Sequence, residues 1–257
     1  MWLIVLRAVW RKSALTWLSY WLNGLTGIVN YYIIFALLFF GAKSIGAGAP
    51  HLGNSLDTLF ASYVAWMLAM AGCYDLAWNV MDEASTGTLE QLFLSPVGYK
   101  WVAFSTEMFN FLSTAVTVAI VVVSLVVTTG QTIHLDVLNV LPPMLAIYLQ
   151  AVGLGFAIAG LALIQKRVQY PIQVVQFILA AFVLMPSTMF TWAKYLPLSM
   201  GKDMLQEVLM EGKSFWHLGS GSIVVVTAIT ALYMVVGLGC FSLAESAAKR
   251  RGLLGHY

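Results

Sequence analysis

The sequence contains six long intervals that lack Asp, Glu, Lys and Arg. They lie between Lys12 and Lys43, Asp57 and Asp75, Glu107 and Asp136, Asp136 and Lys166, Arg167 and Lys194, and Lys213 and Glu245. A helix needs about 20 mostly apolar residues to cross a bilayer, so each interval can house one transmembrane helix. Charged residues make up only 9% of the chain, which is far below the usual fraction in soluble domains. We therefore predict an all-α integral membrane protein with six spans.

The expected spans cover residues 22–40, 58–79, 109–129, 144–164, 170–190 and 223–243. No internal repeat or low-complexity tract divides the chain, so residues 1–257 are expected to form one membrane domain. The fourth span is expected to begin after Pro142 and Pro143, because proline at a helix start removes only donors that would be unpaired anyway. In the same span, Gly153 with Ala157 and Gly155 with Ala159 form small-xxx-small patterns that let another helix approach closely.

Two further helices are expected at the membrane surfaces. Residues 1–20 mix basic residues with Trp, Leu and Val, which is typical of an amphipathic helix lying in the interface. Residues 200–211 place Leu205, Val208 and Leu209 opposite three acidic residues and are followed by Gly212. This pattern predicts a short amphipathic helix before the last span, dipped into the outer interface.

The positions of the basic residues indicate the orientation of the chain in the membrane. With the N-terminus inside, nine of the 13 Lys and Arg residues are cytoplasmic: Arg7, Arg11, Lys12, Lys100, Lys166, Arg167, Lys249, Arg250 and Arg251. The other four are outside: Lys43, Lys194, Lys202 and Lys213. Both termini and the segment between the second and third spans are therefore expected in the cytoplasm, with the protein in the plasma membrane.

That segment, residues 82–96, is a polar insert in an apolar chain. Gly87 can adopt the positive φ that turns the chain after the second span. Thr88 and Gln91 form a capping box that starts a helix, Glu90 lies in its first turn, and Pro96 ends it. Leu89, Leu92 and Phe93 share one face of this helix of about two turns. So short a helix is not stable alone, so we expect its apolar face to dock on the protein or membrane, leaving Asp82, Glu83 and Glu90 for a soluble partner. A well-capped loop helix without a partner is the alternative.

Polar residues inside the spans are candidates for a substrate path, because they must face protein or water. Gln169, Gln173 and Gln176 lie on one face of the fifth span, which also carries Met185 and Met189. Amides that join neighbouring helices are the alternative interpretation. In the second span, Asp75 lies one helical turn before Asn79, with which it could pair. Asp75 and Glu107 could instead remain at the nearby interface.

Several residues in the insert resemble the loop after the second helix of ABC-2 type permeases, the membrane subunits of ATP-driven exporters. They are Glu83, Gly87, Thr88, Leu89, Glu90, Gln91, Leu92, Ser95 and Pro96. The resemblance extends in outline to the amphipathic N-terminal helix, the six spans, and Leu196-Pro197 with a short outer helix before the last span. The Asn-Pro pair that many members carry after this position is missing here.

The resemblance implies that the 82–96 helix couples the permease to a separate ATPase, present in two copies, which binds ATP and Mg. It also implies that two permease chains pair, as a homodimer, and that the second and fifth spans flank the path. The expected function is export of an amphipathic drug, antibiotic, peptide, lipid or glycan. We expect no cofactor, metal or catalytic residue in this chain.

A secondary transporter and a membrane enzyme are the alternative functions for a chain with these residues. A secondary transporter driven by an ion gradient would use Asp75 and Glu107 as coupling acids, but the halves show no repeat. A membrane enzyme would need paired carboxylates or a nucleophile and base inside the spans. Gly212-Lys213-Ser214 lacks the earlier glycine of a phosphate-binding loop, and three outer histidines (His51, His134 and His217) lack metal-site spacing. The small net charge of +2 argues against nucleic acid.

Overall fold

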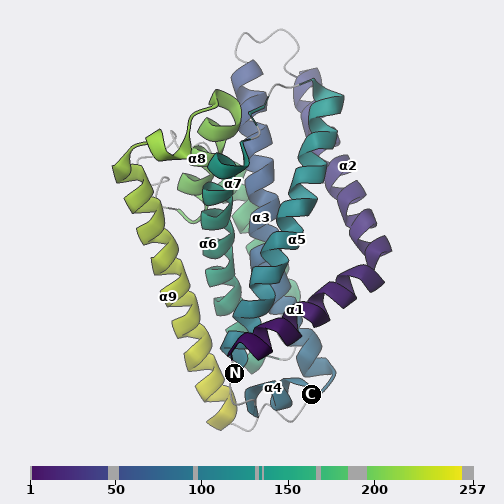
Figure 1. Ribbon diagram of the computed structural model, residues 1–257, viewed down its shortest axis with the longest axis vertical. Helices are drawn as coiled ribbons and strands as arrows, with labels where there is room; N and C mark the ends of the chain where they lie inside the picture. Colours follow the sequence, from purple (N-terminus) through teal and green to yellow (C-terminus); the bar gives the residue numbers. More distant parts are fainter. Residues whose placement is uncertain are drawn as a thin grey trace.

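The computed structural model describes residues 2–45, 52–94, 98–130, 133–134, 136–165, 169–184 and 196–250. These residues are almost entirely helical, and none of them forms a strand, which confirms the predicted all-α class for this part of the chain (Figure 1). The helices are α1 (Trp2–Ser19), α2 (Trp21–Ile45), α3 (Leu52–Ser85), α4 (Leu89–Leu94), α5 (Tyr99–Thr129), α6 (Val137–Ile164), α7 (Gln169–Leu184), α8 (Ser199–Glu211), η2 (Phe215–His217) and α9 (Ser220–Arg250).

Five helices in the described part of the chain are long and apolar enough to cross a membrane, which fits a multi-pass membrane protein. Their candidate spans are Trp21–Ser44, Thr58–Ala84, Tyr99–Thr129, Val137–Ile164 and Ser220–Arg250. The expected span at 170–190 corresponds to α7, whose apolar part, Ile172–Ala181, is shorter than a span. Residues 185–190, including Met185 and Met189, lie outside the described residues. The structure therefore bears out five of the six expected spans.

The start of α6 differs from the prediction. The helix begins at Val137, and Pro142 and Pro143 lie inside it. The reason is the cap at Asp136, whose side chain accepts a hydrogen bond from the backbone N–H of Leu138 at 3.1 Å. This cap starts the helix before the prolines and satisfies one of the donors that a helix start leaves unpaired.

Helix α6 packs between α3 and α9, and glycines permit both contacts. A Cβ atom on Gly155 would lie 2.8 Å from the carbonyl oxygen of Gly72 in α3. A Cβ atom on Gly153 would lie 2.6 Å from the carbonyl oxygen of Tyr233 in α9. The helix backbones are therefore in direct contact on two faces of α6, and the close approach predicted from the small-xxx-small patterns is confirmed.

On the other side of α3, aromatic rings join α3 to α2. Phe35 of α2 is fully buried and packs edge-on against Phe60 and Tyr63 of α3, with ring centroids 5.5 and 5.1 Å apart. The Tyr63 hydroxyl donates a hydrogen bond to the carbonyl oxygen of Tyr31 at 2.6 Å. These contacts hold α2 beside α3, and the rings of Tyr31 and Trp66, with centroids 6.1 Å apart, extend the aromatic interface.

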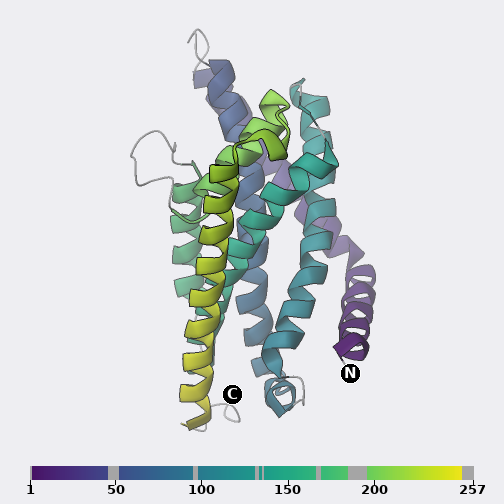
Figure 2. The ribbon, with the colours of Figure 1, turned by 60° about the vertical axis from the view of Figure 1, so that its left-hand side comes forward.

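Different helices occupy the two ends of the bundle. Helices α1 and α4 and the C-terminal end of α9 lie at one end, and α8 lies at the other (Figures 1 and 2). The chain bends sharply at Tyr20, so that α1 crosses the end of the bundle instead of continuing the line of α2 (Figure 1). The termini of the described chain and α4 thus share one end, as the predicted topology requires.

Helix α8 packs on the helix bundle with its apolar face. Its apolar residues Leu205, Val208 and Leu209 are buried, and the helix contacts α3 and α6. The apolar face of α8 is therefore covered by protein, and the expectation that this helix lies in the outer interface stays a prediction. Burial also lowers the pKa of the Lys202 ammonium, and the Asp203 carboxylate 3.7 Å away opposes that shift.

Candidate functional site

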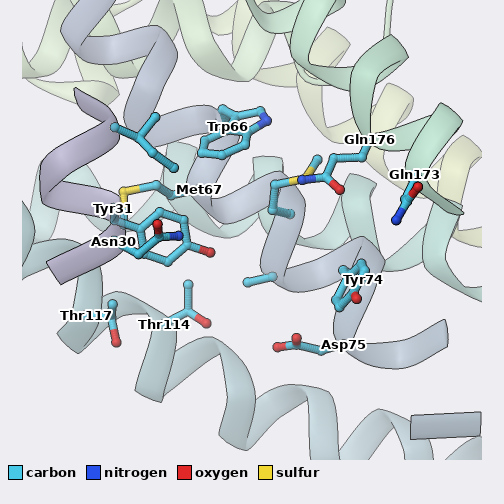
Figure 3. A pocket seen from close by; sticks show the side chains of 13 residues that line it. Asn30, Tyr31, Trp66, Met67, Tyr74, Asp75, Thr114, Thr117, Gln173 and Gln176 are labelled. Atoms are coloured by element: carbon cyan, nitrogen blue, oxygen red, sulfur yellow. The ribbon is translucent and has the colours of Figure 1, made fainter. Parts of the chain in front are cut away.

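A cavity of about 420 Å³ lies among α2, α3, α5 and α7 (Figure 3). This volume falls within the range of small-molecule sites, roughly 300–1,000 Å³. Thirteen of the described residues line it: Asn30, Tyr31 and Ile34 of α2, Trp66, Met67, Met70, Ala71, Tyr74 and Asp75 of α3, Thr114 and Thr117 of α5, and Gln173 and Gln176 of α7.

Helical periodicity places these residues around one space. The α3 residues recur at intervals of three or four from Met67 through Met70 and Ala71 to Tyr74, so they form one face of that helix. Thr114 and Thr117 of α5 are three residues apart, as are Gln173 and Gln176 of α7. Each helix therefore turns a polar or aromatic face to the cavity.

The cavity has a mixed polar and apolar lining. Among the described residues that line it, Asp75 is the one charged residue, and none is Lys, Arg or His. Three amides, from Asn30, Gln173 and Gln176, offer both donors and acceptors, and the rings of Tyr31, Trp66 and Tyr74 offer aromatic faces. This set can bind an amphipathic molecule by ring contacts and hydrogen bonds, and a positive charge by Asp75.

The structure brings together residues that the sequence singled out in two different spans. Asp75, Gln173 and Gln176 line the same cavity, whereas Asn79 does not line it. None of the hydrogen bonds found between described residues joins Asp75 to Asn79, so the suggested pairing is not observed. The side chain of Gln169, together with Met185 and Met189, lies outside the described residues.

Several cavity residues were not found by sequence reasoning. Asn30 and Tyr31 stand in the middle of an apolar run, and Thr114 and Thr117 stand in a span rich in Val and Thr. A polar amide in the centre of a predicted span was a usable signal for Asn30. Thr carries no such signal, because its hydroxyl can bond to its own helix, as Thr117 does to the Ser113 carbonyl oxygen at 3.0 Å.

Glu107 lies in a separate buried network. Its side chain belongs to α5 and is 2% exposed, so it does not remain at the interface. The Tyr148 hydroxyl of α6 donates to one carboxylate oxygen at 2.8 Å, and the Asn110 amide donates to the other at 3.3 Å. Glu107 does not line the cavity that holds Asp75. Its described contacts join α5 to α6.

A second polar network was also missed by sequence reasoning. The buried Gln150 amide of α6 donates to the Thr230 hydroxyl of α9 at 3.0 Å and accepts from the Leu198 backbone N–H at 2.8 Å. Leu198 has a φ of 71°, a left-handed conformation that is costly for a residue other than Gly. Gln150 thus fixes the turn before α8, and the hydrogen bond supports the strained backbone there.

The second candidate element is α4, the short helix in the polar insert. Gly87 has a φ of 74°, which confirms the predicted turn, and α4 follows at Leu89–Leu94. Leu89 is 1% exposed, and Leu92 and Phe93 pack against the hydrophobic core. The predicted apolar face is therefore docked on the protein. Gln91 is exposed, whereas the side chain of Glu90 and Pro96 lie outside the described residues.

Ring and charge contacts tie α4 to the ends of α5 and α9. The Phe93 ring lies 5.1 Å from the ring of Tyr99 at the start of α5, and Tyr99 stacks on Phe241 of α9 at 5.7 Å. The Lys249 ammonium of α9 lies 5.3 Å above the Phe93 ring, a cation–π contact. Helix α4 is therefore in direct contact with two of the candidate spans.

Glu83 joins the insert to α1. Its carboxylate lies 3.1 Å from the Lys12 ammonium of α1, and the Thr88 hydroxyl donates to the same side chain. Thr88 thus bonds back toward the end of α3, while its carbonyl oxygen accepts the first helical hydrogen bond from Leu92 at 3.1 Å. Glu83, singled out for a partner, has contacts within this chain that position α1 against the insert.

No group of three or more His, Cys, Asp or Glu residues in the described part of the chain is close enough to hold a metal ion. His134 lies before α6, its backbone N–H bonded to the Leu209 carbonyl oxygen at 2.8 Å, and His217 lies in η2. His51 lies outside the described residues.

Comparisons with protein-family models, curated proteins and solved structures found no match for this chain. Its candidate function therefore rests on the residues and the geometry described above.

Proposed function

We propose that this chain is the permease subunit of an exporter that is driven by a separate ATPase. Two copies of the chain form the path, and the cavity lined by Asp75, Gln173 and Gln176 is its substrate-binding part. Two ATPase copies bind ATP and Mg and contact the permeases at α4. The protein lies in the plasma membrane with both termini in the cytoplasm.

The observation that carries this proposal is a cavity of about 420 Å³ among apolar helices, to which amides, hydroxyls and a carboxyl group contribute. Polar groups at membrane depth are costly unless they face protein or water, so an unfilled polar space there has a functional explanation. Its mixture of amides, hydroxyls, rings and methionines suits an amphipathic substrate, and methionine side chains adapt to ligands of different shape.

The exposure of the cavity supports pairing of two chains. Asn30, Tyr74 and Gln173 line the cavity and are also exposed at the surface of the single chain. Lipid would leave the amides of Asn30 and Gln173 without hydrogen-bond partners. A second copy beside α2 and α7 would cover these residues and enclose the path between the two chains.

The attachment of α4 supports the ATPase contact. This helix lies at the end of the bundle (Figure 1), with Leu89 buried and Gln91 exposed. Its packing on α5 and α9 through Phe93 would pass a push on its exposed face to the spans. The ion-gradient alternative is less well supported, because Glu107 lies apart from the cavity and has partners in Tyr148 and Asn110.

Co-purification with the ATPase and ATP-dependent export in vesicles test this function. Glu83→Ala and Glu90→Ala are expected to weaken the complex or to uncouple ATP hydrolysis from export. Glu211→Ala in α8, at the opposite end, is the matched control and should change neither. Unchanged complex formation, ATPase rate and export in both α4-side variants would refute the assignment of α4 as the coupling helix.

A further inference from the structure

We infer that the cavity selects substrates that carry a positive charge next to aromatic or aliphatic groups. This inference rests on the proposed function for the role of the cavity, but the chemistry comes from the lining residues. The class is that of lipophilic organic cations, which includes protonated amines and quaternary ammonium or phosphonium ions.

The charge balance of the cavity is the first step. Asp75 is the one carboxylic acid among the described lining residues, and none of those residues is basic. None of the ion pairs found within the described ranges includes Asp75. A carboxylate at membrane depth is costly unless an opposite charge is close, so a cationic ligand would supply a partner that the described residues do not. An anionic ligand would meet only repulsion.

The aromatic residues are the second step. Tyr31, Trp66 and Tyr74 line the same cavity as Asp75, and Trp66 and Tyr31 pack edge-on with centroids 6.1 Å apart. Aromatic faces attract cations, with Trp the strongest, and the attraction is larger where water is excluded. Figure 3 shows Asp75 and Tyr74 together on the α3 side, with Tyr31 and Trp66 farther along the cavity. A ligand can therefore place its charge at Asp75 and its apolar groups among the rings.

The amides are the third step, because they determine which contacts each kind of cation can make. Gln173 and Gln176 of α7 lie across the cavity from Asn30 and Tyr31 of α2 (Figure 3). Their oxygens can accept hydrogen bonds from a protonated amine, whereas a quaternary cation would use only charge and ring contacts. Both kinds of cation satisfy Asp75, so the cavity is expected to accept cations of several shapes.

Binding of two ions of matched shape and opposite charge tests the inference. Labelled tetraphenylphosphonium and tetraphenylborate are bound, without ATP, to the full chain with its co-purified partner in nanodiscs. Excess unlabelled ion corrects for uptake into lipid. Wild type should bind the cation saturably and discriminate against the anion. Asp75→Asn should weaken cation binding by about tenfold or more, Asp75→Glu should retain most of it, and Glu211→Gln should leave it unchanged.

Equal binding of the two ions, or cation binding that is the same in Asp75→Asn and wild type, would overturn the inference. A misfolded Asp75→Asn variant is recognised by its lowered melting temperature. In that case the comparison of cation and anion binding to the wild-type protein decides alone. The result is separable from the proposed function. If Asp75→Asn no longer binds the cation but the complex shows no ATP-driven export, the cation site is supported and the proposed exporter function is refuted. If export is driven by ATP but the wild-type protein binds both ions equally, the exporter function is supported and the cation site is refuted.

Discussion

Gly153→Ala should weaken the contact between α6 and α9 and so lower the stability of the protein. The new Cβ atom would lie 2.6 Å from the Tyr233 carbonyl oxygen, 2.7 Å from its carbon and 2.9 Å from the Met234 nitrogen. All three are backbone atoms of α9, so no side chain can rotate away. Since ordinary contacts begin at 3.4 Å, the closest pair must separate by 3.4 − 2.6 = 0.8 Å.

A gap of this size forfeits about a quarter to a half of the dispersion energy of each contact it opens. Overpacking of this kind costs about 1–3 kcal/mol. For a chain of this length, each kcal/mol lowers the melting temperature by about 2–4 °C. Gly153→Ala should therefore melt several degrees below wild type in detergent.

Gly239→Ala is the matched control, because it adds the same methyl group to α9 at a position with no atom within 4 Å. Alanine also favours a helix over glycine by about 0.5–1 kcal/mol, so this variant should melt at or slightly above the wild-type temperature. Gly237→Ala meets the Gly153 carbonyl oxygen and should resemble Gly153→Ala. Equal melting temperatures for Gly153→Ala and Gly239→Ala would refute the argument from backbone contact.

Two further predictions concern buried polar and apolar anchors. Gln150→Leu leaves the buried Leu198 N–H without its acceptor, which costs about 1–3 kcal/mol and should lower the melting temperature. The control Gln165→Leu, at an exposed position, should not lower it. Equal melting temperatures for the two variants would count against a structural role for Gln150. Leu89→Ala should loosen α4 alone, because Leu89 is the most buried of the described side chains in that helix. The expected sign is faster amide hydrogen exchange in residues 86–94 with the spans unchanged, and unaltered exchange there would contradict the docking of α4.

Much of the fold is accessible from the sequence because the membrane leaves few alternatives. Backbone groups in lipid must be bonded within the segment, so an apolar interval long enough to span becomes a helix. Five of the expected spans coincide with helices that are long and apolar enough to cross a membrane. Gly87 has the positive φ that its position predicts. The Gly153 and Gly155 contacts follow equally well, since only small residues let helix backbones touch.

Boundaries and partners were less accessible, and the errors have local causes. The cap at Asp136 starts α6 ahead of its prolines, so a side-chain hydrogen bond overrode the reading of Pro142 as a helix start. The apolar face of α8 is covered by α3 and α6, which its sequence pattern does not identify. An amphipathic pattern states that a face is buried, and it does not state what buries it.

The sequence by itself determined that the chain is a helical membrane protein with a short helix after the turn at Gly87, because hydropathy and turn chemistry act over neighbouring residues. Tertiary structure alone decided which polar residues meet. Asp75 and Gln173 lie about 100 residues apart and share one cavity, whereas Glu107, equally acidic in the sequence, is bonded to Tyr148 away from it. Helix packing brings distant residues together, and no local pattern carries that information.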